Sequence, residues 1–581
     1  MSNDKKAIEI YLKSLKEEKE VVNVDLKTYD GSGDKYTLKL QDHKGSVFKK
    51  VKREAFIVLF ERHLLILEKG LGKVIYSTHF LNLKEFAISD DPNNNIIRIT
   101  FYGKGVHSDT NNGTTNPSVS PDEYVILFFH VLDSTDKQII LGTIYKFYAN
   151  TFPGCQSFYE RRFSQVPLPM IDIEKEALAE AAKSQAPPPA GGYYNAYRAM
   201  CEWAGEPMCR ELVWDLSYMY TSEKSRDFNT HFMNVQKIPA RTLMPVFSVL
   251  GLNSFFTTLH IANAPIDRDT SNSLGWMFRN NRTLTDVSFV NCGLNDQTLA
   301  SIADAINTNT RGLPLTALEI SSNPLEDRGL GRVASILRDA EFRLTKLRLV
   351  KCGCSSGGIT ALISALSKNP GLIGSLKLFE FSRNSVGNET IAKDLSEVLS
   401  RSKIEKLVLR DTKLNFDAFA KYKMDIPSID FSGNHNLTVA KHLNGLAELL
   451  NKSSLITTLS IANCSLSSSN IEYLWKSTTR MNKLEELNIS DNESLGVEGV
   501  TMLLRKVAGC KTLVKLDFSN CFDKDQKRVK DLVDELKRYS ASMDCPTHIR
   551  MAGGKHPLGP DLLRFVLDLI GNERIKYIDI S

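Results

Sequence analysis

The second half of the chain repeats one arrangement of apolar positions. Each copy reads L-x-x-L-x-L-x-x-N, where L stands for any apolar residue and x for any residue. The last position holds Asn, Cys or a small residue. The segment Leu315–Asn323 shows the arrangement clearly. Twelve matches starting between residues 256 and 575 give a mean step of about 29 residues, which is the period of a leucine-rich repeat.

Each repeat predicts one short strand and one helix. The second and third apolar positions point into the core, and the residues between them point to the opposite, concave face. A helical apolar pattern follows, as in Thr298–Asn307. This is the long, ribonuclease-inhibitor type of repeat. We therefore expect an α/β horseshoe with parallel strands on the concave face and helices outside.

The ninth position of each repeat predicts a structural ladder. It lies where the backbone turns away from the strand and leaves amide groups unpaired. Asn can satisfy such groups, which otherwise cost about 1–3 kcal/mol each. Cys is small and commonly buried, so we interpret these cysteines as structural rather than catalytic or redox-active. The ladder residues are Cys292, Asn323, Cys352, Asn384, Asn434, Cys464, Asn492 and Cys521.

The concave-face positions carry mixed charge and no aromatic stripe, so no strong binding anchor is predicted there. Four cations near the middle of the array form a basic group. We weigh this group as a protein-binding patch against the alternative of a plainly solvated face. Its members are Lys346, Arg348, Lys406 and Arg410.

Residues 1–163 predict a small antiparallel barrel that is closed by a helix. Short β-like runs, among them Ala55–Leu67, alternate with turn-forming residues from Val21–Tyr29 to Tyr124–Leu132, and each run predicts a strand. One helical segment, Asp133–Asn150, follows. Many antiparallel strands and one closing helix resemble the plan of a pleckstrin-homology domain.

The segment Lys44–Arg53 in this barrel holds five cations and no acidic residue. Each cation is worth about 1 kcal/mol near an anionic membrane, so we expect acidic phospholipid to bind here. The alternative is a solvated strand edge, where lysines also discourage edge pairing. The predicted lipid-binding residues are Lys44, Lys49, Lys50, Lys52 and Arg53.

Two segments connect the barrel to the repeats. Residues 164–192 are rich in Pro, Ala and Gly and predict a linker. Residues 193–253 are aromatic and directly precede the repeats, which occupy 254–581 with the last one incomplete. A repeat array exposes an apolar end that a cap must cover, so this segment predicts a helical cap. A ligand pocket around Trp203 and Trp214 is the alternative.

Composition and motifs argue against several classes of function. The net charge of +5 over 581 residues is slight, which argues against general nucleic-acid binding. The start of the chain is charged and is no secretory signal, and no apolar run approaches the ~20 residues of a spanning helix. The ten cysteines include no C-x-x-C pair. No phosphate-binding glycine loop and no nucleophile elbow occurs. We expect a cytosolic protein with no enzymatic activity, cofactor or metal.

The order of these parts and several segments resemble the CARMIL proteins, which link actin capping protein and myosin I. The resemblance implies a scaffold of the cytoskeleton that lies peripherally at the plasma membrane. It implies that the barrel binds acidic phospholipid, that the repeats bind proteins, and that helical segments after the repeats form a homodimer. The similar segments are Tyr197–Pro207, Glu211–Asp215, Arg226–Asn229, Leu243–Val246, Asn253–Leu259 and Asn323–Gly329.

In that family the regulation of actin filament ends resides in a basic motif of a disordered tail, and no such motif follows the repeats here. The chain stops at Ser581, inside the first strand of a repeat. Because an array ends in a polar cap, we expect the natural protein to continue and to bind capping protein and myosin I outside these residues. The alternative function is a GTPase-activating or other GTPase-regulating protein, since one class of such activators also uses long repeats.

Overall fold

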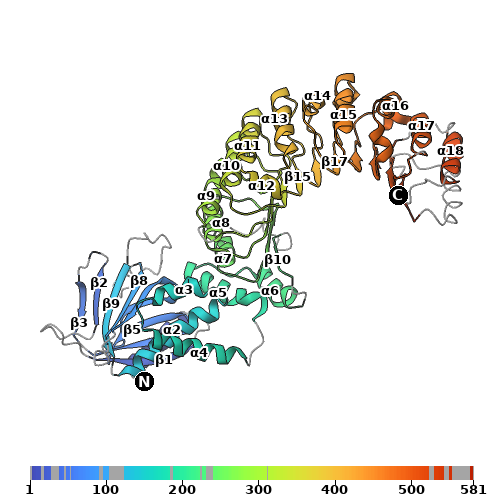
Figure 1. Ribbon diagram of the computed structural model, residues 1–581. Helices are drawn as coiled ribbons and strands as arrows, with labels where there is room; N and C mark the ends of the chain where they lie inside the picture. Colours follow the sequence, from blue (N-terminus) through green and yellow to red (C-terminus); the bar gives the residue numbers. More distant parts are fainter. Residues whose placement is uncertain are drawn as a thin grey trace. The chain divides into compact units, whose positions relative to one another are not determined.

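The computed structural model divides into two compact units (Figure 1). Unit 1 comprises 1–227, 237–257 and 276–283, and unit 2 comprises the remaining residues. The domain boundaries at 163, 192 and 253 stay predictions. The structure describes residues 3–14, 19–27, 38–42, 44, 47–52, 54–89, 96–103, 124–131, 133–183, 188–222, 225–230, 240–309, 312–508, 510–521, 529–541, 548–551 and 576–579.

Unit 1 is built on an antiparallel sheet of nine strands, as the sequence predicts in outline. The strands run in the order β3-β2-β9-β1-β4-β5-β6, and β8 joins β7 to β9. The pleckstrin-homology assignment stays a prediction. The strands are β1 (Glu20–Lys27), β2 (Leu38–Asp42), β3 (Val47–Val51), β4 (Ala55–Phe60), β5 (His63–Glu68), β6 (Lys73–His79), β7 (Leu83–Ile88), β8 (Ile96–Tyr102) and β9 (Tyr124–Val131).

The predicted single strand Ala55–Leu67 is wrong, because β4 and β5 form a hairpin in this region. Every residue of β4 is buried, so no alternation of polar and apolar residues marks where the strand ends. The turn uses two charged residues, Glu61 and Arg62. The Arg62 side chain turns back into the fold and pairs with Glu202.

Helix α2 (Ser134–Thr151) packs against the sheet and confirms the predicted closing helix. Asp133 caps it by accepting the N–H of Asp136 at 2.9 Å. Its buried side includes Ile140 and Ile144. The Tyr148 hydroxyl donates to the carbonyl of Phe80 at 2.6 Å, which ties the helix to the turn after β6.

Further helices complete unit 1. The segment predicted as a linker contains α4, where Gln138 Nε2 of α2 donates to the Met170 carbonyl at 3.1 Å. Trp203 Nε1 of α5 donates to Asn82 Oδ1 at 2.7 Å, so α5 is bound to the sheet region. These helices are α1 (Asn3–Ser14), α3 (Gln156–Tyr159), α4 (Leu168–Lys183), α5 (Tyr193–Ala204), α6 (Arg210–Ser222) and α7 (Ala240–Leu250).

Unit 2 carries the repeats, and its sheet runs in sequence order from β10 to β22. Neighbours from β11 onwards are parallel and in register, with the helices on the outer side (Figure 1), as predicted. The strands are β10 (Asp227–Asn229), β11 (Thr258–Ala262), β12 (Asp286–Val290), β13 (Ala317–Ser321), β14 (Lys346–Arg348), β15 (Leu378–Glu380), β16 (Lys406–Val408), β17 (Ser428–Asp430), β18 (Thr458–Ser460), β19 (Glu486–Asn488), β20 (Lys515–Asp517), β21 (His548–Arg550) and β22 (Tyr577–Asp579).

Each strand is followed by a turn and then, in most repeats, by an outer helix with one apolar stripe. In β13 the side chains of Leu318 and Ile320 are buried and Glu319 points to the concave face. The helices are α8 (Arg268–Asn280), α9 (Asp296–Asn307), α10 (Glu326–Asp339), α11 (Ser356–Lys368), α12 (Pro370–Ser375), α13 (Glu389–Ser400), α14 (Phe416–Phe419), α15 (Ala440–Lys452), α16 (Ser468–Ser477), α17 (Gly496–Val507) and α18 (Val529–Ala541).

The ladder residues lie at the turn after each strand, and their side chains bond to the preceding repeat. Asn323 Oδ1 accepts the N–H groups of Cys292 and Leu294 at 2.8 and 3.2 Å. Its Nδ2 donates to the carbonyls of Phe289 and Ser321, both at 2.9 Å. The asparagines at the other ladder positions likewise accept a backbone N–H and donate to a carbonyl of the preceding repeat. Along the array the ladder position is occupied in turn by Cys292, Asn323, Cys352, Asn384, Thr412, Asn434, Cys464, Asn492 and Cys521.

The residue before each ladder position has a left-handed backbone. This holds for ten successive repeats, whether the residue is Asn, Asp, Gly, Ser, Lys or Arg. A left-handed φ strains residues other than Gly, Asn and Asp, so the turn is imposed by the repeat even at Lys351 and Arg383, where φ is 53° and 58°. This conformation directs the backbone N–H groups after the strand toward the core, where the Oδ1 atoms of the ladder asparagines accept their hydrogen bonds.

Candidate functional site

The concave face of unit 2 presents two outward positions per strand. Because the strands are parallel and in register, equivalent side chains form two rows across the sheet. The first row runs Lys346, Leu378, Lys406, Ser428, Thr458, Glu486, Lys515, His548 and Tyr577. The second row runs Arg348, Glu380, Val408, Asp430, Ser460, Asn488, Asp517, Arg550 and Asp579.

The four residues of the predicted basic group lie close together, on β14, on β16 and just after β16. Two of them are matched by acids on adjacent strands. Arg348 lies between Glu319 and Glu380, with nitrogen–oxygen distances of 3.9 and 3.4 Å. Arg410 pairs with Asp430 at 2.6 Å, and this bond raises the pKa of the guanidinium.

Lys346 and Lys406 occupy the first row and are exposed. Leu378 of β15 separates them in the register. The positive charge that the group offers to a partner is therefore concentrated at these two lysines, because both arginines already face carboxylates.

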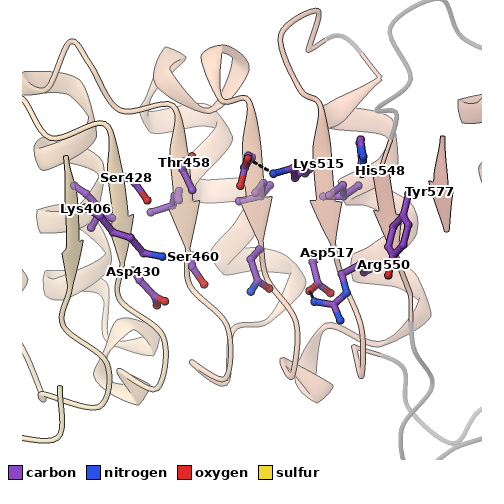
Figure 2. A pocket seen from close by; sticks show the side chains of 16 residues that line it. Lys406, Ser428, Asp430, Thr458, Ser460, Lys515, Asp517, His548, Arg550 and Tyr577 are labelled. Atoms are coloured by element: carbon purple, nitrogen blue, oxygen red, sulfur yellow. Dashed lines mark hydrogen bonds and ion pairs between the residues drawn. The ribbon is translucent and has the colours of Figure 1, made fainter. Parts of the chain in front are cut away.

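A hollow of about 540 Å³ lies on the concave face over β16 to β22. Figure 2 shows small polar side chains toward the Lys406 end of the hollow, among them Ser428, Thr458 and Ser460. In its middle Lys515 Nζ bonds to Glu486 at 2.5 Å. The short side chains leave room for a bound segment, and their hydroxyls offer donors and acceptors to it.

Aromatic side chains stand at the far end of this hollow. The rings of His548 and Tyr577 stack with centroids 6.0 Å apart, and Tyr577 is half exposed. Below them Arg550 bridges Asp579 at 2.9 Å and Asp517 at 3.8 Å. The sequence did not predict these rings, because the search for an aromatic stripe considered the second row only. Reading both outward positions of each strand finds them.

The ladder thiols are not placed for chemistry. The Cys292 and Cys521 thiols donate to carbonyls of the preceding repeat at 3.2 and 3.1 Å. Burial raises the pKa of Cys292 to about 11 and those of Cys464 and Cys521 to about 12. These thiols stay protonated at neutral pH, and a protonated thiol is a poor nucleophile. In the described part of the chain, no three His, Cys, Asp or Glu residues gather closely enough to hold a metal ion.

The predicted lipid-binding residues lie on and beside the edge strand β3. Lys44 and Lys52 are exposed, and Lys44 donates its backbone N–H to Asp42 at 2.9 Å. Lys49 and Lys50 are neighbours on the strand and point to opposite faces. Lys49 is opposite the buried Leu40 and is itself half-buried. Arg53 lies outside the described residues.

The outward face of the sheet gathers cations over aromatic rings. Lys50 is opposite Lys39, and Lys39 is opposite Phe128 of β9. Lys39 Nζ stands 5.3 Å from the centre of the Phe128 ring. In the same way Lys84 Nζ lies 3.7 Å from the ring centre of Tyr124. Cations over rings are attracted by the ring quadrupole, so this face combines positive charge with apolar area. Among the described helices, none is long and apolar enough to span a membrane.

Comparisons with known proteins find relatives of this chain that carry different names. No family model matches the chain. The chain is 21% identical over 530 residues to Rho GTPase-activating protein gacW of Dictyostelium discoideum. This alignment covers 90% of this chain and 44% of that protein. The chain is 22% identical over 448 residues to Protein CARMIL of the same organism. This alignment covers 71% of this chain and 42% of that protein.

A third relative is human capping protein, Arp2/3 and myosin-I linker protein 3, which is 27% identical over 194 residues, covering 33% of this chain and 14% of that protein. The chain thus spans less than half the length of each of these relatives. Matches to CARMIL proteins and the parallel repeat sheet lead to one conclusion: the chain is a CARMIL-like leucine-rich-repeat protein.

Proposed function

We propose that this protein is a non-enzymatic scaffold that regulates actin filament assembly and binds protein partners on the concave face of its repeats. The observation that carries the proposal is the match to Protein CARMIL over 71% of the chain. The hollow over β16 to β22 supports it, because it offers short hydroxyl side chains beside charged pairs rather than a set of catalytic groups.

GTPase regulation is the second candidate function, and the match to gacW favours it. Identity to gacW and to Protein CARMIL is nearly equal, at 21% and 22%. Two relatives with different printed names therefore resemble overlapping parts of this chain. We infer that this part is a common binding platform, and that the activity of each whole protein depends on residues that differ between the relatives.

We further propose that unit 1 contains a pleckstrin-homology-like domain that holds the protein peripherally at acidic membranes. The predicted residues Lys44, Lys49, Lys50, Lys52 and Arg53 supply part of the charge. Of these, Lys50 lies on the outward face of the sheet opposite Lys39, and the further cations Lys39 and Lys84 on that face lie over aromatic rings. Each cation near an anionic surface contributes about 1 kcal/mol.

Capping protein, myosin I and a second copy of the chain are proposed partners of the whole protein. They follow from the printed names of the CARMIL relatives and from the family resemblance, and the chain spans less than half of those relatives.

The scaffold proposal is tested by affinity capture with a variant that fills the hollow. Ser460→Trp places a large ring where the central side chains are short. The matched control is Lys393→Glu, an exposed change on the outer helix α13. Actin-regulatory proteins should bind the wild type and the control and be lost from Ser460→Trp. Equal recovery by all three would contradict binding in the hollow.

Two further assays separate the alternatives. Sedimentation with phosphatidylserine vesicles should retain the wild type and Lys393→Glu and lose Lys39→Glu/Lys50→Glu, while phosphatidylcholine vesicles retain none of them. GTP hydrolysis by Rho-family GTPases should be unchanged by the chain. A stimulation of hydrolysis would favour the second candidate function.

A further inference from the structure

Helix α6 of unit 1 exposes two aromatic side chains that the cap does not use. Trp214 is 56% exposed and Tyr218 is 62% exposed. The inward side of the helix carries Leu212 and Leu216, which are buried. The assignment of this segment as a cap stays a prediction, and within it Trp214 and Tyr218 point away from the buried side of the helix.

The two rings lie against each other, with centroids 5.4 Å apart and planes tilted by 31°. Large exposed aromatics are uncommon in folded proteins because their apolar area stays in water. Trp and Tyr are also the residues that most often dominate the energy of protein interfaces. An exposed, preassembled Trp–Tyr pair therefore indicates a binding surface.

Two carboxylates share this face of the helix. Residues three and four apart on a helix are surface neighbours, so Glu211, Trp214, Asp215 and Tyr218 form one four-membered surface. We call it the α6 patch. In the described part of the chain, no Lys, Arg or His lies within ion-pair distance of either carboxylate. The Cys209 thiol donates to Glu211 at 3.3 Å.

The pKa of Asp215 is raised, first by its partial burial and then by the charge of Glu211. The repulsion between the two carboxylates is thus the smaller cause, and the pKa of Glu211 is lowered, first by a backbone hydrogen bond and the Cys209 thiol and then by the charge of Arg210. A cation placed between them would relieve the repulsion, and the rings beside it would attract the same cation through their faces.

We propose that the α6 patch docks a partner protein through an arginine side chain of that partner. The planar guanidinium can stack on Trp214 while its N–H groups donate to the carboxylates of Glu211 and Asp215. Arginine fits better than lysine because its flat fork both stacks on a ring and pairs with carboxylates. Anionic partners such as acidic membranes and nucleic acids are disfavoured by the same carboxylates.

The test uses the full chain labelled with 5-fluorotryptophan. The sequence contains four tryptophans, so four fluorine resonances are assigned with single Trp→Phe variants. The probe is an acetylated peptide of alternating arginine and alanine, compared with the matching lysine and glutamate peptides. The arginine peptide should shift the Trp214 resonance to saturation and leave the Trp475 resonance in place. The lysine peptide should bind several-fold more weakly, and the glutamate peptide should cause no shift.

Glu211→Gln/Asp215→Asn removes both charges and keeps the shape of the side chains. It should weaken the arginine peptide about tenfold at low salt, the combined effect expected from two carboxylates around one cation. Trp475→Phe, a change in a half-buried ring of α16, should leave the affinity unchanged. Unchanged thermal melting of the double variant excludes unfolding as the cause.

Three results would overturn the proposal. They are a Trp214 resonance that does not respond to the arginine peptide, equal responses to the arginine and glutamate peptides, and a double variant that binds as well as the wild type. A larger response to phosphatidylserine vesicles than to the arginine peptide would replace the proposed occupant with a membrane and also count against it.

Discussion

Asn434 provides the sharpest test of how the repeats are held together, through the variant Asn434→Ala. The side chain is 1% exposed in the middle of the array. Its Oδ1 accepts the N–H groups of Thr412 and Leu414 at 3.1 and 3.2 Å. Its Nδ2 donates to the carbonyls of Leu409 and Phe431 at 2.9 and 2.7 Å. The Thr412 hydroxyl also lies 3.2 Å from Oδ1, so alanine removes five hydrogen bonds in all.

The cost is set mainly by the two N–H groups. Each buried donor left without an acceptor costs about 1–3 kcal/mol, so the pair predicts a loss of about 2–6 kcal/mol. The carbonyls add less, because the Leu409 oxygen also accepts the Thr412 hydroxyl at 3.2 Å and the Phe431 oxygen also accepts the Cys464 thiol at 3.6 Å.

Two variants calibrate the measurement. Thr412→Val deletes one buried hydroxyl of similar shape and should cost about 0.5–1.5 kcal/mol. Asn444→Ala deletes an exposed amide on α15, whose bond to Glu448 is 3.4 Å long, and should stay within about 0.5 kcal/mol. Urea unfolding followed by circular dichroism gives the total change. Because repeats unfold with their neighbours, hydrogen exchange over β16 to β18 is needed to locate it.

The reasoning fails if Asn434→Ala costs no more than Asn444→Ala. It also fails if Asn434→Ala speeds hydrogen exchange uniformly over unit 2 rather than around β16 to β18. Either outcome would mean that the turn satisfies its N–H groups without the ladder.

Three other predictions follow from buried groups. The pKa of the buried His79 is lowered, chiefly by desolvation and then by the charges of a neighbouring histidine and arginine. His79 therefore stays neutral in the fold and takes up a proton on unfolding below its usual pKa of 6.5, so the free energy of unfolding should fall by about 1 kcal/mol from pH 7 to pH 5.5. His79→Gln should flatten that slope in urea titrations. The thiols of Cys464 and Cys521 have pKa values of about 12 and should resist a disulfide reagent at pH 8 until the protein is unfolded, as peptide mapping would show. Gly445→Ala sets a Cβ 2.5 Å from the backbone at the start of α14 in the preceding repeat and should lower the melting temperature, with a cost of about 1–3 kcal/mol. Gly331→Ala has open space around the new Cβ and should stabilise α10 by about 0.5–1 kcal/mol.

The repeat frame was predictable because its signal is long and redundant. Leu318 and Ile320 are buried as the pattern requires, and each of the other repeats restates the same spacing. In the sheet of unit 1 the signal fails locally. A strand that is buried on both faces, such as β4, shows no alternation, so its boundary with β5 lies in two charged turn residues that single-sequence patterns do not distinguish.

The candidate sites were harder to predict, because they depend on distances between residues that are remote in sequence. The sequence marks Arg410 as a cation, but the pairing with Asp430 requires two adjacent repeats to be in register. The same limit applies to the aromatic residues before the repeats. A helical pattern places Leu212 and Trp214 in one helix, and only the packed structure shows that the first is buried and the second exposed.

The concave face can vary while the frame of the repeats stays the same. The core positions and the ladder fix the strand, the turn and the register, whereas most residues of the two outward rows lie outside the core; the buried Val408 is an exception. On this face the charges of Arg348, Arg410 and Lys515 are already matched by acids on adjacent strands. Charge pairs that satisfy each other contribute little to a new partner. For the proposed binding of protein partners, the exposed lysines Lys346 and Lys406 and the short side chains of the hollow are therefore the residues to test. Changing these residues should exchange partners and leave the unfolding free energy of the array unchanged.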